Sequence, residues 1–270
     1  MQPQKDPPVN QFAYGLKLLQ NEFEIEDSVE QATEGLLAEG QLGERAPRLY
    51  RELGTALSLF VQMACCQWSC RGGEHREENL LRRLVNYSFG VLRLARLGLY
   101  NESISMLRSV AELANSIELF TVRRDHLNDW HSTPATERWK SYGPAKVRQK
   151  IEATGNRPVV DKDTYAALCD AGVHVSPESA KLSHQFDGKV SAGGEFSPMA
   201  FLLVLNELAI MLSACLKLSG DFIQAQKDRI QLLTDAGTRL ESNATAWLRI
   251  TNYDQRIREG GKDGGNGTDT

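Results

Sequence analysis

The chain has 270 residues and a formal net charge of −4, and 41% of its residues are hydrophobic while 24% are charged. This length suits one large domain or two small ones, and the composition is ordinary for a globular protein in water. The negative net charge excludes a surface that is basic throughout, but it allows a local basic patch of the kind that binds nucleic acid.

The cysteines and the N-terminus predict a cytoplasmic location. The chain has five cysteines, an odd number, and is too long to need disulfides for stability. Its first ten residues contain three prolines and lack the basic and then apolar pattern of a secretory signal. We therefore expect residues 1–10 to be a flexible arm of a protein that folds in a reducing compartment.

Apolar residues recur at helical spacing through the first hundred positions. Residues 11–40 show this pattern in one or two pieces, opposite an acidic face. Two further helices are expected at about 47–70 and 74–97. Gly98 is suited to follow the second of these and Asn101 to N-cap the next, so the short connection predicts an antiparallel helical hairpin.

Two stretches are apolar over most of a helical circumference and should be the most buried helices. The first is Ile104–Phe120, within NESISMLRSVAELANSIELF. The second is Phe201–Leu216, in a helix that Ser197 and Pro198 begin as N-cap and first residue. The second helix has about the length of a membrane span, but polar residues interrupt it and no basic or aromatic belt flanks it. We expect a core helix and no membrane association.

The chain between these two helices is more polar and less regular. A helix at 136–152 should break at Gly143-Pro144, and Asp161 should cap a short helix that Gly172 closes. The segment 174–194 is rich in Ser, Gly and Pro, and its Asp187-Gly188 pair suggests a turn in a small hairpin.

After Gly220 a long amphipathic helix is expected from Asp221 to about Arg258, followed by a polar, glycine-rich tail at 259–270 that should be disordered. The predicted fold class is therefore all-α: an antiparallel helical bundle with a long polar, irregular insertion and a long C-terminal helix, forming a single domain over residues 11–258.

Two charges interrupt the first buried helix, Arg108 and Glu112, one turn apart on the same side. If both are buried, each needs a partner, because an unpaired buried charge is costly. Either they form a structural ion pair, or they are part of a polar site that binds an anion or positions a substrate. Tyr165 and His174 lie near the end of a predicted helix, where the histidine can serve as an acid or a base or as a structural hydrogen-bonding group.

A second arrangement joins Arg124, six intervening residues and His131. Metal-independent HEPN ribonucleases use an arginine and a histidine separated by four to six residues, so this pair is a candidate catalytic motif. HEPN sites commonly form across a homodimer, which for this chain predicts His131 near the symmetry axis.

Cysteines gather at one helix end, where Cys65, Cys66 and Cys70 precede His75. Cys66 and Cys70 share a helical face and could chelate zinc with the histidine. The tighter Cys-x2-Cys pairs of structural zinc sites are missing, so the alternative is that these cysteines are small buried apolar residues. No other cofactor motif is visible.

The run LRSVAEL at 107–113, Trp139 in ERWKSYG and YAALCDAGVHVSP at 165–177 resemble an uncharacterised bacterial all-helical family that looks HEPN-like. The resemblance covers about residues 80–215. It implies that Arg108, Glu112, Tyr165 and His174 converge in one cleft, and it implies no particular reaction.

Two functions therefore compete, beside a third reading as a helical bundle that binds a small ligand or a metal. The first is a HEPN-like protein that cleaves RNA without a metal, as an effector of stress or phage defence. The second is a non-catalytic helical module that binds a partner protein. An arginine and a histidine converging in an open groove lined by Arg82, Arg93 or Arg96 would favour RNA, whereas apolar packing around both would favour the module.

Overall fold

A computed structural model describes residues 11–39, 45–68, 74–174 and 193–260. Over these ranges the chain forms ten α-helices and no strand, so the predicted all-α class is confirmed. The helices are α1 (Gln11–Glu39), α2 (Arg45–Ala64), α3 (Arg76–Arg96), α4 (Tyr100–Val122), α5 (Arg124–Ser132), α6 (Ala135–Tyr142), α7 (Pro144–Glu152), α8 (Lys162–Gly172), α10 (Pro198–Phe222) and α11 (Lys227–Gly260).

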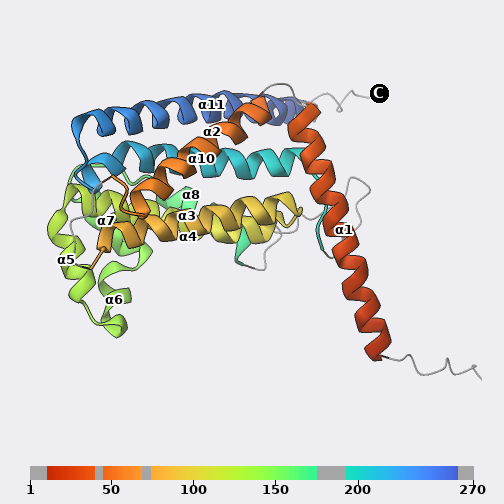
Figure 1. Ribbon diagram of the computed structural model, residues 1–270, viewed down its shortest axis with the longest axis horizontal. Helices are drawn as coiled ribbons and strands as arrows, with labels where there is room; N and C mark the ends of the chain where they lie inside the picture. The colour runs from red at the N-terminus through yellow and green to blue at the C-terminus, as the bar shows by residue number, and fades with distance from the viewer. Residues whose placement is uncertain (1–10, 40–44, 69–73, 175–192, 261–270) are drawn as a thin grey trace, which may run out of the picture.

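The long helices α2, α3, α4, α10 and α11 form the body of the bundle (Figure 1). The short helices α5, α6 and α7 gather at one end of this body, and α1 lies at the opposite end and projects away from it (Figure 1). These three short helices cap one end of the bundle (Figure 1).

The two helices predicted to be most buried form the centre of the core. Leu107, Ile117 and Leu119 of α4 are fully buried, as are Phe201 and many other residues of α10. α10 is long and apolar enough to cross a membrane, yet 72% of its most apolar window is buried by the surrounding protein. Burial of this extent favours a core helix, because a membrane span would present its apolar faces to lipid.

The α3–α4 connection is as short as predicted, but its capping differs. Gly98 adopts φ 76°, and a Cβ there would lie 2.4 Å from the backbone oxygen of Glu195, so the turn needs a glycine. α4 begins at Tyr100 with Leu99 as its N-cap, which makes no side-chain capping bond. The predicted Asn101 cap is therefore wrong.

Several other helix boundaries differ from the prediction. α2 ends at Ala64 rather than near Cys70, and Cys66 just beyond it has a left-handed backbone. α5 is a helix within a segment expected to be polar and loose. α10 does not end at Gly220 but continues through the buried Phe222. α11 begins at Lys227 rather than at Asp221. The chain reverses direction between the two helices through Gln224, whose φ is 53°.

The insertion is held on α4 by polar contacts. α6 and α7 separate at Gly143-Pro144 as predicted, and the Asp161 carboxylate accepts a bond from the Thr164 amide at 2.7 Å, which caps α8. The side chain of Asn115 donates to the Val160 carbonyl and accepts from its amide, at 2.9 Å each. These bonds fix α7 and α8 beside α4.

Some predictions lie outside the described residues. They concern the N-terminal arm at 1–10, Cys70, the Asp187-Gly188 turn and the glycine-rich tail beyond Gly260.

Candidate functional site

A cleft of about 340 Å³ opens where α3 and α4 meet the short helices of the insertion. Aromatic and arginine side chains dominate its lining, and we call it the aromatic–arginine cleft. They are Tyr87 and Arg83 of α3, Trp130 of α5, Trp139, Tyr142 and Arg138 of α6, and Tyr165 of α8. Glu112 of α4 also lines it.

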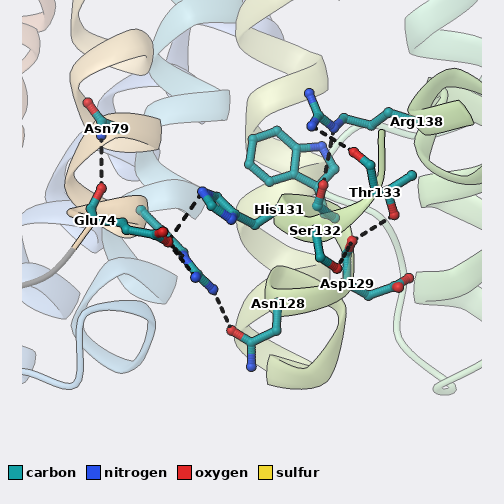
Figure 2. A network of polar contacts seen from close by, with 10 residues as sticks. Glu74, Asn79, Asn128, Asp129, His131, Ser132, Thr133 and Arg138 are labelled. Carbon is teal, nitrogen blue, oxygen red and sulfur yellow. Dashed lines mark hydrogen bonds and ion pairs between the residues drawn. The ribbon is translucent and has the colours of Figure 1, made fainter. Parts of the chain in front are cut away.

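The wall formed by α5 and α6 is held by both stacking and hydrogen bonds. Phe120 at the end of α4 packs against Trp130 and Tyr142, with ring centroids 5.8 and 6.3 Å apart. The Arg138 guanidinium lies 5.1 Å from the Trp130 ring and donates to the carbonyl oxygens of Trp130 and Thr133, at 3.1 and 2.8 Å. Figure 2 shows Arg138 reaching back toward Thr133. Trp139 is 71% exposed, so its indole is available to a ligand.

A short polar chain runs from the cleft wall into α5. The Tyr142 hydroxyl donates to Asp129 Oδ2 at 2.5 Å and lies 3.1 Å from His126 Nδ1. Burial and the Asp129 carboxylate raise the pKa of Tyr142, because both disfavour the phenolate. Burial and the positive charge of Lys150 lower the pKa of His126. Both effects favour the neutral form of this histidine.

Arg108, Glu112 and Tyr165 are brought together as one group. Arg108 Nε lies 3.2 Å from Glu112 Oε1, which also accepts a hydrogen bond from the Tyr165 hydroxyl at 2.7 Å. Burial and this bond raise the pKa of Tyr165. The Arg108 and Glu112 side chains are each 32% exposed, so the pair is partly buried and still reaches solvent. The reason is that α8 covers only part of this face of α4, and the cleft opens beside it.

His174 does not join this group. His174 is exposed and lies just beyond the end of α8, where its backbone amide donates a hydrogen bond to the Cys169 carbonyl at 2.8 Å. Within the described ranges, no hydrogen bond or ion pair connects its imidazole with Arg108, Glu112 or Tyr165. The structure thus brings together three of the four residues that the resemblance grouped.

Arg124 and His131 lie two turns apart on α5 and both contact the start of α3, but neither lines the cleft. Arg124 forms an ion pair with Glu77 and donates to the Phe222 carbonyl at 2.5 Å. His131 Nε2 lies 3.4 Å from Glu74 Oε2 (Figure 2). The two side chains therefore pair with different glutamates, and the Arg124 contacts dock α5 onto α3 and α10.

The cysteines near the end of α2 are not core residues. Cys65 is exposed and Cys66 is partly buried, so the alternative that they fill the core is wrong for both. Cys66 instead contacts His75, with Sγ and Nδ1 3.5 Å apart.

The arginines that the sequence suggested for an RNA groove are not the arginines that line the cleft. Arg82 and Arg93 are exposed elsewhere on α3, and Arg96 pairs with Glu30 and Glu34 of α1. The missed signal was the density of aromatic residues in WHSTPATERWKSY, residues 130–142, which places two tryptophans, a tyrosine and an arginine within two short helices.

The fold and the site together define a helical bundle with an aromatic–arginine cleft at one end. No family model matches the chain, and no curated protein or solved structure was found to be similar to it.

Proposed function

We propose that this protein binds single-stranded RNA, with one or two bases entering the aromatic–arginine cleft. The observation that carries the proposal is the side-by-side placement of Trp130, Trp139 and Tyr142 with Arg83 and Arg138 around one open cleft. Aromatic rings stack on bases, and each such stack is worth about 1–3 kcal/mol. Arginines pair with phosphate and also stack on bases.

The charge distribution supports a local site of this kind. The chain is acidic overall, which disfavours binding spread over the surface. Arg83 and Arg138 line the cleft and Lys150 lies over the Tyr142 ring of its wall, so cationic groups are available there to pair with phosphate. Unpaired bases suit the cleft because in a duplex their faces are stacked on one another and cannot reach Trp139.

Equilibrium binding of a labelled single-stranded RNA oligonucleotide tests this proposal. Replacing Trp139 by Ala removes an exposed stacking surface and should weaken binding by about tenfold or more. Arg138→Ala should weaken RNA binding to a similar extent and reduce the dependence of the RNA affinity on salt concentration. The matched control is Arg82→Ala, because Arg82 lies beside Arg83 in sequence and does not line the cleft. Equal loss in the Arg82 and Arg138 variants would contradict a cleft-specific site.

We further propose a HEPN-like ribonuclease activity in the cytoplasm, serving stress or phage defence. Metal-independent cleavage needs a base to take the proton of the 2′-hydroxyl, whose oxygen attacks phosphorus, and an acid to protonate the departing 5′-oxygen. His126 supports this proposal, because its Nδ1 lies 3.1 Å from the Tyr142 hydroxyl of the cleft wall and its lowered pKa favours the neutral form that a base needs. His131 with Arg124, and His174 with Arg108, are the competing assignments.

Cleavage assays with chelator separate these assignments. General acid–base loss costs about 10²–10⁴ in rate, so one of His126→Ala, His131→Ala and His174→Ala should abolish cleavage. Only the assignment to His131 predicts a symmetric dimer, with His131 near its axis. Light scattering measures whether the protein is a dimer. If the unmodified protein binds RNA but cleaves none, binding stands and the ribonuclease proposal fails.

The alternative function is docking of a partner protein along α1. Leu18, Leu19, Phe23 and Ile25 are 43–61% exposed on α1, and Figure 1 shows that this helix projects from the bundle. The flanking Glu24 and Asp27 are exposed and acidic, so a partner helix with basic flanks fits better than a second copy of α1. Leu19→Ser with Phe23→Ser should abolish such binding without changing RNA affinity.

A further inference from the structure

We propose that Cys66, His75 and Glu78 form a zinc site at the junction of α2 and α3, separate from the cleft. Cys66 follows α2, His75 immediately precedes α3, and Glu78 lies in the first turn of α3. Their ligand atoms all lie within 4.8 Å of one another. A thiolate, an imidazole and a carboxylate are the three ligand types that zinc takes from proteins.

The spacing of the cysteine and histidine ligands fits a tetrahedral ion, and that of the histidine and glutamate is slightly longer. With ordinary zinc bond lengths, sulfur and nitrogen ligands should be about 3.5 Å apart, and nitrogen and oxygen ligands about 3.4 Å apart. Cys66 Sγ and His75 Nδ1 are separated by 3.5 Å, and His75 Nδ1 and Glu78 Oε1 by 3.9 Å. Binding an ion would draw the Glu78 carboxylate closer to His75, and water would take the fourth position.

The backbone supports a role for this cluster. Cys66 and His75 have φ values of 58° and 46°, in the left-handed region that non-glycine residues rarely occupy. His75 is the N-cap of α3, a position usually held by a residue whose side chain caps the helix. Its imidazole makes no capping bond and instead points toward Cys66 and Glu78. Strained backbone of this kind is characteristic of ligand sites.

The charges of the cluster also favour a cation. The Glu78 side chain is only 13% exposed, and the Cys66 thiol beside the imidazole loses its proton when a metal binds. A divalent ion would neutralise both anionic groups and hold the end of α2 against the start of α3. Zinc is the expected ion because it accepts sulfur, nitrogen and oxygen ligands in a four-coordinate site.

Titration of the full-length, chelator-treated protein with Co²⁺ tests the site, because a thiolate bound to cobalt gives a charge-transfer absorption band in the near ultraviolet. We expect one cobalt per chain, displaced by zinc, with affinity that rises with pH. Cys66→Ser should remove the band, whereas the adjacent, exposed Cys65→Ser should retain it. His75→Ala and Glu78→Gln should each weaken zinc affinity by more than about tenfold.

A second measurement uses only the unmodified protein, so it does not depend on the folding of a variant. Zinc should protect Cys66 from alkylation far more than Cys65, as mapped by mass spectrometry. Absence of the absorption band, its survival in Cys66→Ser, or equal protection of the two cysteines would overturn the site and leave the cluster a hydrogen-bonded Cys–His pair. None of these outcomes depends on RNA binding.

Discussion

Glu112 is the residue on which the polar group beside the cleft depends. One of its oxygens contacts the Arg108 guanidinium and also accepts the Tyr165 hydroxyl bond. The sequence could predict the pairing of Arg108 and Glu112, since residues four apart on a helix face each other. It could not predict their exposure, because this depends on how far α8 extends over α4, and that is decided by contacts distant in sequence.

This exposure determines the cost of removing the pair. Because both side chains are one-third exposed, water screens the attraction, and Arg108→Ala should lower the free energy of unfolding by about 0.5–1 kcal/mol. Urea denaturation measures this cost, with wild-type protein as the reference. A loss of about 3–5 kcal/mol would instead indicate a fully buried pair.

Glu207 is a second partly buried carboxyl, on α10. Burial raises the pKa of its carboxyl above the ordinary 4.5, so the folded state disfavours the charged form. The contribution of Glu207 to the free energy of unfolding should therefore be most favourable below pH 4.5. It should become less favourable as the pH rises through the pKa of the folded state. Glu207→Gln should stabilise the protein at pH 7 by more than the usual 0.5 kcal/mol of a surface change and have little effect at pH 4. Equal effects at both values would contradict a buried carboxyl.

At the scale of elements, hydrophobic periodicity sufficed for α3, α4 and α10, whose apolar faces meet one another in the core. It was not enough for α5, where Leu127 is the one buried residue. That helix is fixed by tertiary contacts, notably those of Arg124 with Glu77 and with the Phe222 carbonyl. The break at Gly143-Pro144 and the Asp161 cap were predictable because they depend on local backbone chemistry.

The approach of α8 to α4 gives a prediction about packing. A Cβ on Gly172 would lie 2.6 Å from the Ser105 amide nitrogen and 2.9 Å from the Asn101 carbonyl oxygen. Because these are backbone atoms, Gly172→Ala should displace α8 and cost about 1–3 kcal/mol in a thermal or urea unfolding experiment.

Gly54 of α2 supplies the matched control. Apart from the neighbouring backbone of α2 itself, no atom lies within 4 Å of the position of its Cβ, so Gly54→Ala should stabilise the helix by about 0.5–1 kcal/mol. If the two alanine variants change stability by the same amount and in the same direction, the close packing of α8 on α4 is contradicted.

At the scale of the whole molecule, the cleft is a product of tertiary structure. Its lining comes from α3, α4, α5, α6, α7 and α8, and residues as far apart as Arg83 and Tyr165 face one space. No local pattern reports such convergence, which is why the sequence pointed to Arg82, Arg93 and Arg96 instead. The aromatic density of residues 130–142 was visible, but its meaning depends on α3 and α8 completing the cleft.

Ultraviolet crosslinking of the full-length protein to a single-stranded RNA oligonucleotide, followed by mapping of the crosslinked peptides, tests the central claim most directly. If the aromatic–arginine cleft binds RNA, the crosslinks should fall within residues 130–142, at Trp130, Trp139 or Tyr142, and should be lost in Trp139→Ala. A second groove between α2 and α11 is lined by Arg48, Arg51 and Arg239. Crosslinks confined to that groove, with none in residues 130–142, would contradict the claim.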